Sequence, residues 1–452
     1  MIAARGRLDY AATFAMARGV VLLAILLTMG AVSPDRFDLV IRDARIVHGD
    51  GRVSPRATIC ISAGRIVRIE SATPSSDLQA GRVIDAAGRT VIPGLIDAHV
   101  HVEPWTLPLF LKYGITTVRD VHNRPDYILP LAASESPSQP RIIAAGAMID
   151  GPGSFWKDAI VVDDFVSARA AVRRQVEAGA GVVKVYTKLH PALMAAIVQE
   201  ARARGVPVAA HLGKTTATEA AMIGVTSIEH LSGIADAASA EPQRLYKAHD
   251  DFLGGWTAFE LEWPSLKPAA LDRVARALIE RKVVLVPTLA LHEAFSRLAD
   301  SDLRLDPALA DVPADVLNRS WDPADIMARA HWTPQVLAAF KRTLPVLQRF
   351  VKSYRQLGGR IVAGTDTPQQ FVVPGSSLHR ELELYVAAGL TPAAALKSAT
   401  ADAADLLGIA DRAGTVDVGK DADLVLLDGD PLTEIRATRR IVAVIRGGVL
   451  VH

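Results

Sequence analysis

The feature that most constrains the fold of this 452-residue chain is an alternation of short apolar runs with amphipathic segments. The runs are rich in β-branched residues and apolar throughout, which is typical of strands buried on both faces. Between runs, apolar side chains recur at helical spacing, as at Phe165, Ala168 and Val172, and Gly179 then suits a helix end. The strand candidates are residues 91–102, 114–121, 141–145, 181–187, 207–212, 226–231, 283–289 and 360–366.

Repeated strand–helix units with continuously apolar strands indicate a buried parallel sheet in an α/β protein. Eight such units, over a span close to the roughly 250 residues usual for the fold plus insertions, predict a (β/α)₈ TIM barrel. We assign residues 91–411 to this barrel.

Both ends of the chain have a different pattern of short, β-branched segments. Residues 38–47 and 57–69 read as strands near the N-terminus, and residues 422–427 and 440–451 read as strands near the C-terminus. The Gly447-Gly448 pair suits a tight hairpin in the last of these segments. We therefore expect one small β-sandwich domain built from residues 34–90 and 412–452.

The first 33 residues resemble an export signal. Arg5, Arg7 and Arg18 precede an uncharged apolar stretch, residues 19–32, and small residues follow it. The apolar stretch is shorter than the roughly 20 residues that span a bilayer comfortably, although tilting could make it an uncleaved membrane anchor. We expect export to the periplasm or the outside of the cell, with an anchor or a simple N-terminal extension as alternatives.

Charge and cysteine content exclude two classes of protein. The formal net charge is +1, and no basic run of the kind that follows a phosphate backbone occurs, so nucleic acid is not an expected partner. Cys60 is the single cysteine, which rules out an intrachain disulfide. Its apolar surroundings favour a small core residue.

Two histidines end the first strand candidate. His99 and His101 are two residues apart, so in an extended strand both side chains project to the same face and can reach one cation. On its own, such a pair can equally be two unrelated surface histidines.

Four further polar residues lie late in other strand candidates. Functional side chains of a TIM barrel lie at the C-terminal ends of its strands, so these residues should meet the histidine pair at one rim. Each could be structural on its own, but an unpaired lysine in an apolar strand is costly and needs a partner or altered chemistry. The four are Lys184, His211, His230 and Asp366.

Imidazoles and carboxylates are ligands that suit zinc and its first-row neighbours. A protonated lysine cannot bind a metal, whereas a lysine carboxylated by CO₂ offers two anionic oxygens. With this set of candidate metal ligands, the chain resembles the amidohydrolase superfamily from about Asp38 to its C-terminus. The matching motifs are Pro93-Gly-Leu-Ile-Asp-Ala-His-Val-His101, Gly114-Ile-Thr-Thr-Val-Arg-Asp120, Gly364-Thr-Asp366 and Gly419-Lys-Asp-Ala-Asp-Leu-Val425.

Within that superfamily the chain is most similar to the branch related to imidazolonepropionase and prolidase, with its Xaa-Pro and Xaa-Arg dipeptidases and ochratoxin-hydrolysing amidases. The resemblance implies two divalent ions, with Zn²⁺ the first expectation. His99, His101 and Asp366 would hold one ion and His211 and His230 the other, with carboxylated Lys184 between them. Imidazolonepropionase itself is mononuclear and lacks this lysine.

The resemblance also implies a reaction. A metal-bound hydroxide would attack the amide or peptide C–N bond of a small molecule, such as a dipeptide or N-acyl amino acid, with Asp366 as general acid and base. A cyclic-amide hydrolase or a deaminase would use the same metal ligands. A non-catalytic scaffold is a third reading, which the retained ligand set disfavours. We also expect a homo-oligomer, and membrane association only through the N-terminal segment.

Far more residues separate His230 from Asp366 than two strand–helix units need. We expect lid insertions at about 232–281 and 290–358, which together carry Trp256, Trp263, Trp321 and Trp332. These tryptophans would form an aromatic pocket or, equally, pack the core of the insertions. Tyr186 and His292 are candidate substrate contacts, with a structural hydroxyl and a packing histidine as the alternatives.

Overall fold

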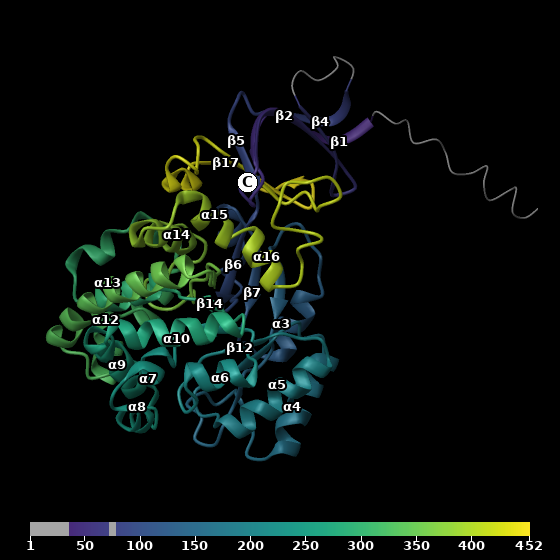
Figure 1. Cartoon of the computed structure of the whole chain (residues 1–452). Coiled ribbons are helices and arrows are strands. Elements are labelled where there is room, and N and C mark those ends of the chain that lie inside the picture. Colours follow the sequence, from purple (N-terminus) through teal and green to yellow (C-terminus); the bar gives the residue numbers. More distant parts are fainter. Residues whose placement is uncertain (1–35, 72–77) are drawn as a thin grey trace, which may run out of the picture.

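The computed structural model describes residues 36–71 and 78–452 (Figure 1). The expected export signal or anchor, residues 1–33, lies outside this part of the chain. Within the described ranges, no helix has both the length and the apolar character needed to cross a membrane.

The two chain ends share one eight-stranded sheet, in which purple N-terminal and yellow C-terminal strands lie side by side (Figure 1). Its order is β18-β17-β16-β5-β1-β2-β3, and β4 pairs with β1. Gly447 and Gly448, both at positive φ, make the turn between β17 and β18 as predicted. The strands are β1 (Arg36–Val47), β2 (Val53–Ser62), β3 (Arg65–Ser71), β4 (Gln79–Asp85), β5 (Thr90–Pro93), β16 (Leu424–Leu427), β17 (Ile441–Arg446) and β18 (Val449–Leu450).

The strands of the middle of the chain form two parallel sheets. One has the order β6-β7-β8 and the other the order β10-β9-β11-β12-β13-β14-β15. In the described residues, the strand pairings do not make one closed barrel, and the strands of the chain ends form one sheet and not a two-sheet sandwich. The strands are β6 (Leu95–Val100), β7 (Ile115–Asp120), β8 (Arg141–Ala144), β9 (Ile149–Asp150), β10 (Ile160–Val161), β11 (Val183–Val185), β12 (Val208–Ala210), β13 (Ser227–Glu229), β14 (Val284–Val286) and β15 (Arg360–Ile361).

Single backbone contacts connect the two parallel sheets. The amide of Gly181 donates to the carbonyl of Ala144 at 2.9 Å, next to β8 and β11. The amide of Ala98 in β6 donates to the carbonyl of Ala363 at 3.0 Å, and Val100 forms an isolated parallel bridge with Thr367. The two sheets therefore contact each other at two places, next to β8 and β11 and next to β6 and β15.

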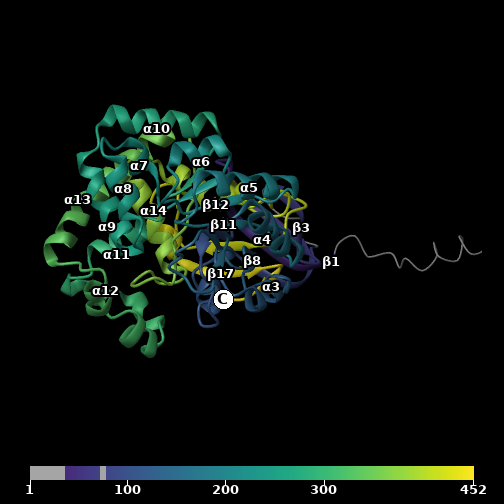
Figure 2. The same ribbon diagram turned by 90° about the horizontal axis from the view of Figure 1, so that it is seen from below.

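Helices surround the parallel strands (Figure 2). A capping box at Asp164 begins α4, whose Ala168 and Val172 are buried, but Phe165 is 53% exposed and so does not belong to its buried face as predicted. The helices are α2 (Leu107–Lys112), α3 (Pro125–Ala132), α4 (Phe165–Glu177), α5 (Pro191–Ala203), α6 (Ala217–Ile223), α7 (Ile234–Ala238), α8 (Pro242–Ala248), α9 (Phe252–Glu262), α10 (Pro268–Glu280), α11 (Leu289–Ser296), α12 (Pro323–Arg329), α13 (Pro334–Gln356), α14 (Ser376–Ala388), α15 (Pro392–Ser398) and α16 (Ala401–Leu406).

The long segments after β13 and β14 are largely helical. Residues 232–281 contain α7 to α10, and residues 290–358 contain most of α11 and all of α12 and α13. Trp256, Trp321 and Trp332 belong to an apolar cluster of buried residues in this region, whereas Trp263 belongs to the main core, where its ring lies 5.4 Å from that of Phe350. All four tryptophans are therefore packed in apolar clusters.

Candidate metal centre

The first group of the site joins the two edges where β6 and the segment after β15 meet. His99 lies in β6, His101 follows it, and Asp366 adopts a positive φ of 64° beyond β15. Nε2 of His101 lies 2.9 Å from Oδ1 of Asp366, and Nε2 of His99 lies 3.4 Å from the same oxygen. One ligand atom from each of the three residues falls within 4.8 Å of the others. The structure therefore brings His99, His101 and Asp366 together.

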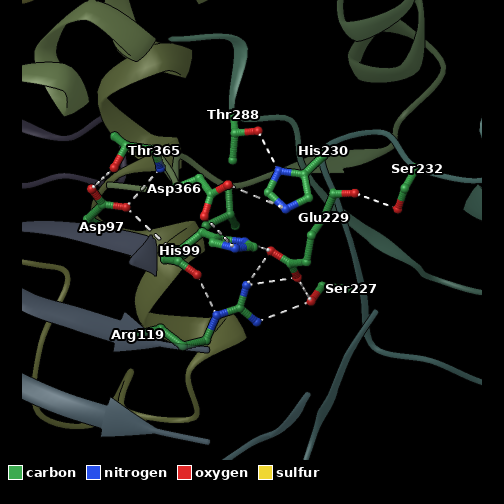
Figure 3. A network of polar contacts seen from close by, with 12 residues as sticks. Asp97, His99, Arg119, Ser227, Glu229, His230, Ser232, Thr288, Thr365 and Asp366 are labelled. Carbon is green, nitrogen blue, oxygen red and sulfur yellow. Dashed lines mark hydrogen bonds and ion pairs between the residues drawn. The ribbon is translucent and has the colours of Figure 1, made fainter. Parts of the chain in front are cut away.

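The other two predicted histidines lie beside this group. His211 follows β12 and His230 follows β13, and their ring centroids are 4.6 Å apart. The ring of His230 is 4.5 Å from that of His99, and its Nε2 lies 4.0 Å from Oδ2 of Asp366. All four imidazoles thus form one continuous cluster (Figure 3 shows His99 and His230).

Lys184 lies in β11 with 1% of its surface exposed. No group in the described ranges offers its Nζ a hydrogen bond. Burial lowers the pKa of Lys184 to about 8, against the attraction of the Glu229 and Asp366 carboxylates. In the strand pairing Lys184 lies beside Ala209 of β12, two residues before His211. Its charge contributes to the lowered pKa values of His211 and His230.

The charge of the site is concentrated on Asp366. Burial acts to raise the pKa of Asp366, but the His230 and His99 imidazoles and the hydrogen bonds with His101 and His99 outweigh it and hold this pKa well below its usual range. Burial also holds the pKa values of His211 and His230 well below the usual value for histidine. The site therefore combines a carboxylate whose pKa is held low with two imidazoles, His211 and His230, whose charged form is disfavoured, while hydrogen bonding to Asp366 outweighs burial and raises the pKa of His101.

The histidine tautomers show how these groups face one another. Nδ1 of His99 lies 2.6 Å from a Glu229 oxygen, and Nδ1 of His101 lies 3.0 Å from the carbonyl oxygen of His122. Both partners can only accept, so each Nδ1 carries a proton, and the Nε2 of each ring faces Asp366 with a lone pair when the ring is neutral and with a proton when it is charged. Lone pairs and a carboxylate that face each other require a cation or an extra proton between them.

A buried ion pair beneath His99 was not among the predicted site residues. Both oxygens of Glu229 lie 2.9 Å from Nη2 of Arg119, whose other nitrogens donate to Ala98 and Ser227 (Figure 3). Burial acts to raise the pKa of Glu229, but Arg119 and His99 keep it well below its usual range. A glutamate and an arginine inside apolar strands are the sequence signals that could have revealed this pair.

Asp97 supports the same region from the other side. Its side chain accepts hydrogen bonds from Oγ1 of Thr365, at 2.7 Å, and from the backbone amides of Thr365 and His99. Burial raises the pKa of Asp97 to about 7, against these hydrogen bonds. Asp97 therefore ties β6 to the segment that carries Asp366.

The two candidate substrate contacts occupy different positions. Tyr186 follows β11 and places its ring 4.8 Å from that of His211. His292 is buried in α11, with Nδ1 2.5 Å from Glu260 and with no hydrogen-bond partner for Nε2 in the described part of the chain. Its ring stacks on Trp256 at 5.1 Å, and Trp256 in turn lies 6.0 Å from His230.

The donor set fits a divalent metal. Four imidazoles and one carboxylate are common ligands of zinc and related ions, and the Nε2 atoms of His99 and His101 are already oriented towards a shared carboxylate oxygen. The buried Lys184 amine without a partner fits a group that is modified before it takes part in binding.

Sequence relatives match this chain only locally. L-hydantoinase of Paenarthrobacter aurescens is 39% identical over 66 residues, 15% of this chain and 14% of the relative. Adenine deaminase of Geobacillus kaustophilus (strain HTA426) is 35% identical over 94 residues, 20% of this chain and 15% of the relative. The chain thus matches only about a seventh of the length of each.

Solved structures resemble nearly the whole chain. Bottromycin amidohydrolase has a TM-score of 0.67 at 25% identity, covering 91% of this chain and 86% of its own. A Xaa-Pro dipeptidase with bound methionine has a TM-score of 0.66 at 23% identity (91% and 99%), and ochratoxinase of A. niger has one of 0.65 at 19% identity (91% and 95%). These neighbours indicate a TIM-barrel-type α/β fold and fall in the branch that the motifs suggest.

A sequence profile gives the family directly. The profile of the amidohydrolase family matches residues 90–451, which include every residue of the candidate site. The family name denotes hydrolases that act on carbon–nitrogen bonds. The chain belongs to the amidohydrolase family, as its motifs predict.

Proposed function

We propose that the protein is a metal-dependent hydrolase that cleaves an amide or peptide C–N bond of a small molecule, such as a dipeptide or an N-acyl amino acid. The observation that carries the proposal is the convergence of Nε2 of His99 and His101 on one oxygen of Asp366, with both Nδ1 protons engaged elsewhere. Family membership supports the same reaction type.

We propose a binuclear site. His99, His101 and Asp366 would hold one ion, His211 and His230 the other, and Lys184, carboxylated by CO₂, would bridge them; Zn²⁺ is the first candidate for both. The unpaired amine of Lys184, with its pKa lowered to about 8 by burial, supports this modification because a neutral amine is the form that reacts with CO₂.

Bound divalent ions would supply Lewis acidity that activates water and polarises the scissile carbonyl. The chain's own part in the reaction falls on Asp366, whose low pKa keeps the carboxylate ionised and ready to accept the proton of the attacking water. The same proton is then delivered to the leaving nitrogen. We also propose that Tyr186 and His292 contact the substrate.

A second candidate is hydrolysis of a cyclic amide or deamination. The local sequence matches to an L-hydantoinase, to allantoinases and to adenine deaminases favour it, and the donor set would serve it equally well. A scaffold without activity remains the least supported reading, because the whole donor set is present.

We further propose that the two parallel sheets close into a single (β/α)₈ barrel over residues 91–411, beside a composite β domain of residues 34–90 and 412–452. The contacts from Gly181 to Ala144 and from Ala98 to Ala363 support closure. We propose from the sequence alone that residues 1–33 direct export or anchor the protein. The proposal that the protein forms a homo-oligomer also rests on the sequence alone.

The test is a library of dipeptides, N-acyl amino acids and cyclic amides assayed with zinc-loaded protein. Lys184→Ala and Asp366→Asn are the critical variants, and Lys267→Ala, an exposed lysine, is the matched control. Hydrolysis by the wild type and the control, with loss in both critical variants, supports the proposal. Equal hydrolysis by all four proteins would show that the assigned chemistry is wrong.

A further inference from the structure

A cavity borders the second pair of histidines. Its volume is about 370 Å³, a figure that includes open solvent space at its mouth. His211 and His230 line it on one side. Any group that occupies this cavity therefore lies directly beside the proposed reaction centre.

One helix supplies the aromatic wall of this cavity. Phe252, Trp256 and Phe259 all lie on α9 at positions four and seven apart, which places them on the same helix face, and all three line the cavity. The ring of Phe252 lies 6.0 Å from that of His211, and the indole of Trp256 lies 6.4 Å from it. The wall therefore reaches the candidate ligands.

Trp256 also brings an unused hydrogen-bond donor. The residue is 8% exposed, and within the described ranges its Nε1 has no hydrogen-bond partner. A buried indole N–H normally finds an acceptor, because leaving it unpaired costs free energy. A ligand oxygen in the cavity would satisfy it.

A residue of another helix holds the indole of Trp256 in place. The indole stacks on the imidazole of His292 with ring planes 19° apart, and Glu260 fixes that imidazole through Nδ1. Because Glu260 lies on α9 and His292 on α11, the contact locks the two insertions together around Trp256. His292 is thus a positioning residue for the indole in this arrangement.

We propose that Phe252, Trp256 and Phe259 form an aromatic subsite beside His211 and His230, which takes an aromatic ring carried by the amide substrate while Nε1 of Trp256 donates to an oxygen next to that ring. The inference rests on the proposed function and names its substrate class. Offset or edge-on ring contacts contribute free energy beyond simple burial and so favour aromatic over aliphatic groups.

The test measures binding without turnover, by calorimetry in an Asp366→Asn background. N-benzoylglycine carries the ring on the acyl side and N-acetyl-L-phenylalanine on the amine side; N-acetylglycine and N-acetyl-L-alanine are their aliphatic counterparts. We expect one aromatic ligand to bind at least about 10-fold more tightly than its counterpart, since burying a ring adds more than about 1.4 kcal/mol. The ligand that shows the preference identifies the side that enters the cavity.

Three substitutions in the Asp366→Asn background test whether Trp256 causes the preference for aromatic ligands. Trp256→Leu should remove most of it, whereas Trp256→Phe should keep the ring preference but weaken aromatic binding roughly 2- to 12-fold through loss of the N–H donor. Phe165→Leu, at an exposed aromatic residue outside the cavity, should change nothing. Circular dichroism and thermal unfolding establish that each variant is folded.

Equal binding of aromatic and aliphatic ligands, no binding at millimolar concentration, or an undiminished preference in folded Trp256→Leu would overturn the subsite. Wild-type hydrolysis of the same compounds is measured separately. Aromatic preference without hydrolysis would contradict the proposed function but support the subsite. Hydrolysis without aromatic preference would support the proposed function but contradict the subsite.

Discussion

The carboxylate of Glu229 accepts a hydrogen bond of 2.6 Å from Nδ1 of His99. Arg119 engages both oxygens of the same carboxylate at 2.9 Å, so Glu229 is fixed in position and stays ionised. A carboxylate behind a metal-binding histidine sets its tautomer, orients the ring and makes Nε2 a better ligand. Glu229 therefore determines how His99 faces Asp366.

Glu229→Gln should weaken metal binding roughly 10- to 100-fold, the usual effect of removing such a carboxylate. The amide keeps the shape of the side chain but loses the charge that raises the basicity of His99. Competition with a chromogenic chelator measures the affinity. Glu280→Gln changes an exposed glutamate in the same way and should leave the affinity as it is; equal affinities in both variants would remove Glu229 from the site.

Lys184 should destabilise the metal-free protein in a pH-dependent way. Burial lowers its pKa to about 8, whereas lysine in an unfolded chain titrates near 10.4, so the unfolded state binds the proton more tightly. The penalty is fully present below about pH 8 and disappears as the pH rises towards 10.5. It amounts to about 3 kcal/mol of unfolding free energy at pH 7.

Metal-free Lys184→Met should therefore be more stable than the metal-free wild type at pH 7, and its advantage should shrink by about 2.5 kcal/mol by about pH 10. Urea unfolding in CO₂-free buffer at several pH values gives this difference. An advantage that does not change with pH would mean that the amine is already paired or modified when the metal is absent.

Asp366→Asn should lower kcat by roughly 10²- to 10⁴-fold with a smaller change in KM, because the amide cannot accept the proton of the attacking water. The measurement is steady-state kinetics on the best substrate of the library, at equal metal content. Asp411→Asn, at an exposed aspartate, is the control. A kcat within a few fold of the wild type would assign the proton transfer to another group.

His379 should make the protein sensitive to acid. Burial, aided by the charge of Arg439, lowers its pKa to about 3, and its ring nitrogens contact Tyr113 and Thr438. Histidine in an unfolded chain has a pKa near 6.5, so below that pH the unfolded state takes up a proton that the folded state does not. Stability then falls by up to about 1.4 kcal/mol per pH unit between about pH 6.5 and 3.

His379→Gln should flatten this part of the stability profile, because glutamine cannot take up the proton. Chemical unfolding at pH 7, 6, 5 and 4 compares the variant with the wild type and with His331→Gln, at an exposed histidine. If the His379→Gln and wild-type profiles run parallel, the acid sensitivity of the protein has another origin.

Much of the site was predictable because its signals are local. His99, His101, His211 and His230 end apolar strand candidates, and residues at the C-terminal ends of parallel strands come together whatever the loops do. Trp321 and Trp332 lie in an apolar cluster of the insertions, as the packing alternative predicts, and Trp256 both joins that cluster and lines the cavity beside His211.

Other features depend on partners that are distant in the sequence. Glu229 of β13 and Arg119 of β7 form an ion pair, and the sequence around either residue does not indicate its partner. Phe165 has the spacing of a buried helix face but lies at the first position of α4, where the helix rises out of the core. The spacing of apolar residues predicts which face of a helix is buried. It does not predict how deeply each residue of that face is buried.

The central claim is that two divalent ions are bound at one site in each chain. Metal analysis of the purified full-length protein after dialysis, with Lys184→Ala alongside, tests it most directly. We predict about two equivalents of metal per wild-type chain and fewer in the variant. A folded wild-type chain that binds only one equivalent of divalent metal, or none, when supplied with zinc would contradict the claim.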